Sequence, residues 1–216
     1  MFITFEGIEG SGKSSHAEKL AKRLESIGYH VVITSEPGGT KIGKRIREIL
    51  LAPESKGMDV KCELLLYLAD RVQHQKDAIV PALNAGEIVI CDRYFDASVA
   101  YQAKARGLGK FAEELIYQFA EPVPNLTILF DCLVETGIKR AKKRIAQKNE
   151  QAQARFEAEG ADFHRRVRAA YLALAKSHPD RIKVVNTEQH EAKVGEAVWE
   201  IVSKYIRDRR CRRLQP

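Results

Sequence analysis

The chain has 216 residues, of which 44% are hydrophobic and 30% are charged, as is typical of a globular protein with room for a sizeable core. No apolar run approaches the roughly 20 residues that cross a bilayer, and the N-terminus lacks a secretory signal, so we expect a cytoplasmic protein without membrane contact. The formal net charge of +7 suits a protein that handles anions, and the four scattered cysteines form no CxxC pair that would indicate a zinc site.

Apolar runs of strand length, rich in Ile and Val, recur along the chain. They cover residues 2–5, 31–34, 88–91, 126–130 and 182–185. Helical spacing of apolar residues is found between and after them, over residues 16–27, 62–75, 111–120, 134–145, 162–176 and 192–207. This alternation predicts an α/β fold with a five-stranded parallel sheet covered by helices on both sides. No repeat or Pro-rich linker divides the chain, so we expect one domain over residues 1–216.

A glycine-rich loop follows the first predicted strand. Gly7-Ile8-Glu9-Gly10-Ser11-Gly12-Lys13-Ser14 matches G-x-x-x-x-G-K-[ST] in full. Such a loop turns its backbone N–H groups toward phosphate oxygens, while Lys13 reaches the outer phosphates and the Ser14 hydroxyl ligates Mg²⁺. A plain flexible turn is the alternative, but the position between a buried strand and an amphipathic helix favours a nucleotide site.

A nucleotide site alone fits either a kinase or a nucleotide hydrolase. The chain has no N-K-x-D or D-x-x-G motif, which disfavours a GTPase. A small kinase needs a second, arginine-rich pocket for its acceptor. Three stretches are candidates for that pocket: 35–40 with Arg47, 66–71, and 92–94 followed by Ser98, Tyr101 and Gln102. The first and third follow strands, and open α/β sheets bind ligands at the carboxyl ends of their strands.

The stretches "FEGIEGSGKSS", "EPGGT", "YLADR" and "DRYFDASVAYQ" resemble the bacterial form of thymidylate kinase, in this order and at these spacings. The resemblance covers residues 1–205. It implies a P-loop NTPase fold, a three-layer α/β/α sandwich with a small mobile lid. It also implies phosphoryl transfer from ATP to dTMP with Mg²⁺, giving ADP and dTDP, and a homodimer. Another nucleoside monophosphate, such as UMP or dUMP, stays open as the acceptor.

The resemblance implies a dTMP site formed by Glu9, Glu36, Pro37, Arg47, Tyr67, Arg71, Arg93, Ser98, Tyr101 and Gln102. Tyr67 would stack on thymine, and Arg71, Ser98 and Gln102 would lie at the base. Without the resemblance, the sequence favours Tyr67 as a core residue of a leucine-rich helix.

At the other end of the dTMP site, Tyr101 would favour deoxyribose and Glu9 would hold the 3′-hydroxyl. Arg47 and Arg93 would grip the acceptor phosphate. Glu36 and Pro37 belong to the turn near the phosphates.

The ATP site implied by the resemblance consists of Gly7, Ile8, Glu9, Gly10, Ser11, Gly12, Lys13, Ser14, Ser15 and Arg140. Arg140 would lie along the adenine. Asp92 would act on Mg²⁺ together with Ser14. Asp131 is a rival for the metal, and a strand-end cap on the backbone or the P-loop is the alternative interpretation of Asp131.

The family carries a catalytic arginine either in the P-loop or in the lid, and this P-loop has none. The predicted lid covers residues 142–156. The expected catalytic residues are Lys13, Arg93 and a lid arginine, with Arg144 preferred over Arg155. Residues 146–153 depart from the shorter, arginine-bearing lid of the family.

The C-terminal tail, residues 207–216, is strongly basic. Its first seven residues contain five arginines and one aspartate. We interpret the tail as a solvated, frayed end. A nucleic-acid-binding P-loop protein is a remote alternative, and no nucleic acid is expected as a partner.

Overall fold

The computed structural model describes residues 1–148, 155–156 and 159–213. Within them, five strands form one parallel sheet in the order β2-β3-β1-β4-β5. The strands are β1 (Phe2–Glu6), β2 (Val31–Ser35), β3 (Ile88–Asp92), β4 (Leu126–Asp131) and β5 (Ile182–Asn186). The predicted α/β fold with a five-stranded parallel sheet is confirmed.

Each strand extends one residue beyond the apolar run that predicted it. The additional residue is polar in every case: Glu6, Ser35, Asp92, Asp131 and Asn186. Parallel pairing brings these ends to one edge of the sheet, and Asp92 is in register with Phe5 of β1 and Ser35 of β2. The carboxyl edge of the sheet is therefore lined with polar groups.

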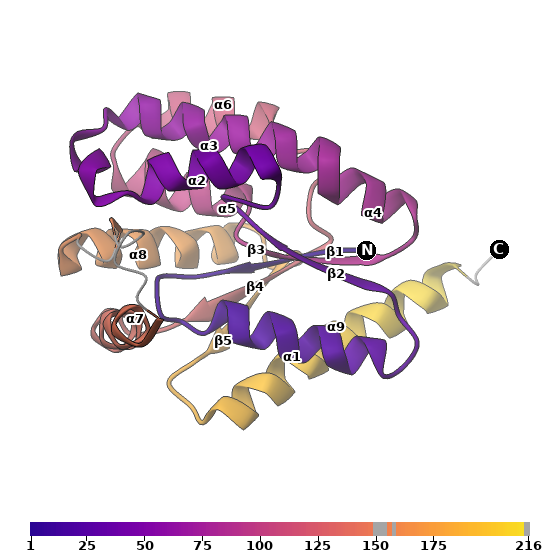
Figure 1. Cartoon of the computed structure of the whole chain (residues 1–216). Helices are drawn as coiled ribbons and strands as arrows, with labels where there is room; N and C mark the ends of the chain where they lie inside the picture. Colours follow the sequence, from indigo (N-terminus) through magenta and orange to yellow (C-terminus); the bar gives the residue numbers. More distant parts are fainter. Residues whose placement is uncertain (149–154, 157–158, 214–216) are drawn as a thin grey trace.

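Helices cover both faces of the sheet (Figure 1). The α-helices are α1 (Lys13–Glu25), α2 (Lys41–Leu51), α3 (Val60–His74), α4 (Val80–Asn84), α5 (Phe95–Ser98), α6 (Gly109–Gln118), α7 (Val134–Lys148), α8 (Ala161–Ser177) and α9 (Glu191–Arg213). Shorter helical segments are η1 (Pro53–Gly57) and the π-helical η2 (Gln75–Ile79) and η3 (Val99–Ala105). In Figure 1, α2, α3 and α6 lie on one side of the sheet, and α1 and α9 lie on the other.

Burial of the apolar helix faces against the sheet holds these layers together. On one face, Leu20 and Leu24 of α1 pack with Val198 of α9 against the strands. On the opposite face, Leu64 of α3 and Ile116 of α6 belong to a separate buried cluster. The two clusters correspond to the two faces of the predicted sandwich.

The structure corrects one expectation for the C-terminal tail. Helix α9 continues to Arg213 instead of fraying after residue 207. Arginine is a good helix former, and the tail has no Gly or Pro before residue 213 to stop the helix. The Arg209 guanidinium also donates a hydrogen bond to the side chain of Asn125, at 3.2 Å.

The predicted lid, residues 142–156, begins within α7, and its residues 149–154 lie outside the described residues. Among the described helices, none combines the length and the apolar character that crossing a membrane requires.

Candidate active site

A cavity of about 810 Å³ lies at the carboxyl edge of the sheet, a size typical of small-molecule sites. The predicted site residues that line it are Glu9, Gly10, Gly12, Lys13, Ser14, Ser15, Glu36, Pro37, Arg47, Tyr67, Arg71, Asp92, Arg93, Ser98, Tyr101, Gln102, Arg140 and Arg144. The lining therefore joins the P-loop, the ends of β2 and β3, and parts of α3, η3 and α7 in one space.

The P-loop folds around the amino group of Lys13. Lys13 Nζ donates hydrogen bonds to the carbonyl oxygens of Gly7 and Ile8, at 3.1 and 2.9 Å. Burial and the nearby Arg93 guanidinium lower the pKa of Lys13 to about 8. Helix α1 begins at Lys13, so the positive end of its dipole faces the cavity.

The P-loop also lies directly against helix α7. Gly10 has φ +71, and a Cβ added to it would lie 2.1 Å from the carbonyl oxygen of Gly137. A Cβ added to Gly137 would lie 2.7 Å from the carbonyl oxygen of Glu9. Glycine is therefore required on both sides of this backbone contact, a constraint that the P-loop motif alone does not indicate.

Ser14 and Asp92 meet beside the P-loop. Ser14 Oγ donates to Asp92 Oδ2 at 2.5 Å. The rival aspartate, Asp131, is instead paired with Arg168, whose Nε and Nη2 lie 2.6 and 2.9 Å from its two carboxylate oxygens. The Asp131 side chain thus pairs with an arginine, whereas the sequence suggested that it caps the backbone or the P-loop.

Arg93 occupies an unusual backbone conformation at the end of β3. Its φ is +71, and no other non-glycine residue among those described has a positive φ. Arg93 Nη2 donates to Glu9 Oε1 at 2.9 Å, and the Tyr101 hydroxyl donates to the same oxygen at 2.7 Å. Burial raises the pKa of Glu9, but Arg93, His164 and Lys13 together hold it well below its usual range. Glu9 is therefore an ionised carboxylate that holds Arg93 and Tyr101 together.

The far end of the cavity contains the buried guanidinium of Arg71. Its Nε donates to Glu36 Oε2 at 3.0 Å, and its Nη2 donates to Ser98 Oγ at 2.9 Å. Nη1 has no hydrogen-bond partner within the described residues, although Arg71 is only 1% exposed. A buried donor without a partner is costly, so this nitrogen is suited to a polar ligand atom.

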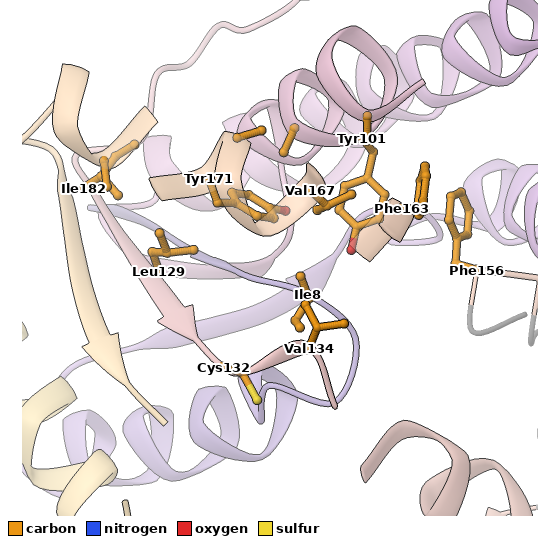
Figure 2. Packing of buried hydrophobic residues seen from close by; sticks show 14 of the residues in the cluster. Ile8, Tyr101, Leu129, Cys132, Val134, Phe156, Phe163, Val167, Tyr171 and Ile182 are labelled. Atoms are coloured by element: carbon orange, nitrogen blue, oxygen red, sulfur yellow. The ribbon is translucent and has the colours of Figure 1, made fainter. Parts of the chain in front are cut away.

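An aromatic wall lies next to Arg71. The ring centroids of Tyr67 and Tyr101 lie 6.4 and 5.7 Å from that of Phe156, and Figure 2 shows Tyr101, Phe163 and Phe156 next to one another. Tyr67 is only partly buried and lines the cavity, which favours a wall residue over the core interpretation. Phe156 also lines the cavity but has no counterpart among the predicted site residues.

Sequence reasoning also missed Glu63, a fully buried residue of α3. Glu63 accepts hydrogen bonds from Gln102, Arg106 and Arg155, the last at 2.7 Å. Arg155 also donates to the carbonyl oxygen of Leu50 at 3.0 Å. Arg155 is thus held beside Glu63 and does not line the cavity, whereas Arg144 does.

Two other predicted arginines make backbone contacts at the cavity. Arg47 Nη1 donates to the carbonyl oxygen of Pro37 at 2.9 Å. Arg140 donates to the carbonyl oxygen of Thr187 at 3.3 Å. Gly7, Ile8 and Ser11 do not line the cavity, but they accept hydrogen bonds from Lys13.

Comparison with known proteins gives a consistent result. The family model described as thymidylate kinase matches residues 5–198. Thymidylate kinase from Solidesulfovibrio magneticus is 46% identical over 209 residues, which cover 95% of this chain and 100% of that protein. The homologue from Maridesulfovibrio salexigens is 50% identical over 192 residues, which cover 88% of each chain.

Similarity in structure agrees with similarity in sequence. The crystal structure of thymidylate kinase from Ehrlichia chaffeensis matches with a TM-score of 0.74 and 30% sequence identity, covering 94% of this chain and 98% of that one. The resemblance carried by the four sequence stretches is therefore confirmed over most of the chain. The chain belongs to the thymidylate kinase family.

Proposed function

We propose that this protein transfers the γ-phosphoryl group of ATP to dTMP, giving ADP and dTDP. The observation that carries the proposal is that Lys13 of the P-loop and Arg93 of the β3 end line one cavity. One cation then serves the donor phosphates and the other serves the acceptor phosphate. Membership of the thymidylate kinase family supports this choice of substrates.

The donor side of the cavity is assigned to ATP. The P-loop residues Gly7 to Ser15 surround its phosphates, with Lys13 at the outer ones. Arg140, held by the Thr187 carbonyl, lies along the adenine.

The acceptor side is assigned to dTMP. Tyr67 stacks on the base. The unpaired Nη1 of Arg71 donates to a base oxygen, and Ser98 and Gln102 lie beside the base. Tyr101 and Glu9 contact the deoxyribose. Arg47 and Arg93 bind the phosphate, near the turn formed by Glu36 and Pro37.

Mg²⁺ fits the Ser14 and Asp92 pair. Both supply oxygen atoms, which are the ligands that Mg²⁺ prefers, and they lie next to the P-loop. Among the described residues there is no cluster of three or more His, Cys, Asp or Glu that could hold a metal ion. A protein that offers so few ligands suits an ion bound mainly by phosphates and water. Bound there, Mg²⁺ would neutralise phosphate charge.

The lid cation is assigned to Arg144. It follows Arg140 by one turn of α7 and lines the cavity beside the P-loop. Arg155 is the weaker candidate, because its Nη1 and Nη2 donate hydrogen bonds to the Leu50 carbonyl and to Glu63.

The chemistry that these residues perform is the control of charge. A phosphate monoester has a second pKa near 6, so the acceptor is mostly a dianion at neutral pH and needs no general base. The barrier is the repulsion between two anions. Lys13, Arg47, Arg93 and Arg144 offset that repulsion and stabilise the equatorial oxygens of the transferring group.

The test is Arg93→Ala. We expect kcat to fall by about 10²- to 10³-fold, because one cation at the transition state is lost. ATP affinity should stay within about threefold, because the P-loop is unchanged. A coupled ADP-release assay and nucleotide titration measure the two effects. Arg165→Ala removes an exposed arginine of α8 and is the matched control. A near-wild-type rate for Arg93→Ala would remove the assignment.

The protein is also proposed to be a homodimer. Helices α2, α3 and α6 lie together on one side of the molecule (Figure 1), and they carry exposed apolar side chains. These side chains, which we call the α2-α3-α6 face, are Ile42, Ile49, Leu65, Val72, Phe111 and Tyr117. Exposed apolar side chains of this size on helices of one layer are typical of a protein interface.

A further inference from the structure

His164 of α8 lies against the P-loop carboxylate. Its Nδ1 is 3.2 Å from Glu9 Oε2, and the residue is only 1% exposed. Neither ring nitrogen of His164 nor Glu9 Oε2 has a well-aligned hydrogen-bond partner within the described residues. Burying three polar atoms without aligned partners is costly, so stability alone does not explain why His164 and Glu9 lie side by side.

The two oxygens of Glu9 face different groups. Oε1 accepts hydrogen bonds from Arg93 and Tyr101, which both line the cavity. Oε2 is buried and faces His164, which does not line the cavity. A donor at Oε2 fixes the rotation of the carboxylate, so that Oε1 stays on the cavity side. His164 can provide that donor with its Nδ1 proton.

The need for this second contact follows from the role of Arg93. In the structure Arg93 is paired with Glu9. When Arg93 binds the acceptor phosphate, that pairing weakens, and Glu9 would be free to turn. A contact from α8 that does not depend on Arg93 keeps the carboxylate in place.

We propose that His164 is a positioning residue, which holds Glu9 so that Oε1 is offered to the 3′-hydroxyl of the acceptor. The inference rests on the proposed contact between Glu9 and the sugar. It predicts that losing His164 harms recognition of the 3′-hydroxyl, while ATP binding and the folded state are kept.

The experiment compares dTMP with 3′-deoxy-dTMP as acceptors for the full-length enzyme. In His164→Leu, kcat/KM for dTMP should fall about tenfold, as expected for one hydrogen bond to a charged group. For 3′-deoxy-dTMP the fall should be less than about twofold, because no 3′-hydroxyl is present. An equal fall for both acceptors would indicate a structural role only and would overturn the proposal.

Two amide variants guard against misfolding of His164→Leu. The amide nitrogen of His164→Asn lies near the position of Nδ1, whereas that of His164→Gln lies near Nε2. We expect the Asn variant to keep the preference for dTMP within about threefold and the Gln variant to lose it. Equal behaviour of the two variants would contradict the proposal. Thermal unfolding checks that both are folded.

Glu9→Gln separates this inference from the proposed function. If Glu9→Gln leaves the preference for dTMP over 3′-deoxy-dTMP intact, the sugar contact of Glu9 is itself wrong. If Glu9→Gln removes the preference and His164→Leu does not, only the role of His164 fails. In the double variant, His164→Leu should cause no further loss of preference, because the carboxylate that it positions is gone.

Discussion

Glu6, the last residue of β1, is a buried acid beneath the Arg93 turn. Glu6 Oε1 accepts the Tyr94 backbone N–H at 2.8 Å, and Oε2 accepts the Tyr171 hydroxyl at 2.8 Å. Burial, with a smaller contribution from Asp96, raises the pKa of Glu6 to about 8. The side chain therefore holds the backbone that follows Arg93, and it retains its proton at neutral pH.

This raised pKa predicts a pH dependence of stability. Between about pH 4.5 and 8, the unfolded chain releases the Glu6 proton and the folded chain keeps it, so stability falls as pH rises. The contribution is complete below about pH 4.5 and lost above about pH 8. Glu6→Gln keeps the shape of the side chain without titrating. We expect its melting temperature to rise relative to wild type from about pH 5 to 8, measured by thermal unfolding. Parallel curves for the two proteins would refute the assignment.

Individual residues were predictable where a motif names them. The P-loop and the β3 end lie in one cavity, as the strand-end argument required, and the α3 stretch lines the same cavity. Glu63, Phe156 and His164 were not predicted, because their partners are distant in sequence. Glu63 lies 39 residues from Gln102 and 92 from Arg155. A local pattern carries no information about such contacts.

At the scale of elements, the contact between the P-loop and α7 is made by two glycines. It sets the position of the helix that carries Arg140 and Arg144 relative to the phosphate loop. The sequence predicted α7 from its apolar spacing but gave no reason for a glycine inside it.

Gly137→Ala tests this contact. Alanine favours a helix over glycine by about 1 kcal/mol, yet the new Cβ would lie 2.7 Å from the Glu9 carbonyl oxygen and 2.9 Å from Ile8 Cδ1. We expect the P-loop to shift and KM for ATP to rise about tenfold or more, measured by steady-state kinetics. Gly195→Ala in α9 is the matched control, because its Cβ would meet only His16, at 3.9 Å. Unchanged kinetics in both variants would show that the loop tolerates the displacement.

The sequence predicted where the strands and helices lie more accurately than it predicted the residues at which they end. The five strands were each predicted one residue short, because the apolar run stops where the polar strand end begins. Helix α9 is longer than predicted, because basic residues were interpreted as a disordered tail rather than as helix formers. Apolar patterns locate what is buried, but the ends of elements depend on backbone pairing.

At the scale of the whole molecule, the α2-α3-α6 face and the cavity share helix α3. Leu65 is 57% exposed on this helix, while Tyr67 and Arg71 line the cavity. A second subunit on this face would therefore pack against the helix that supports the acceptor site.

Leu65→Glu tests the dimer. Light scattering after size exclusion should give wild type about twice the chain mass of 24.3 kDa. A charge placed in an apolar interface should weaken association more than about tenfold. Ile27→Glu alters a residue that is equally exposed, at 57%, away from this face. It should leave the mass unchanged. A monomeric wild type would reject the proposed homodimer.

The pairing of Arg93 with Glu9 also bears on which solutes can enter the cavity. The guanidinium already has a carboxylate partner at 2.9 Å, so part of its charge is neutralised before any anion arrives. A monovalent anion such as chloride gains less from the remaining charge than a dianionic phosphate does. The carboxylate of Glu9 would therefore disfavour common monovalent anions beside Arg93 relative to the proposed phosphate ligand.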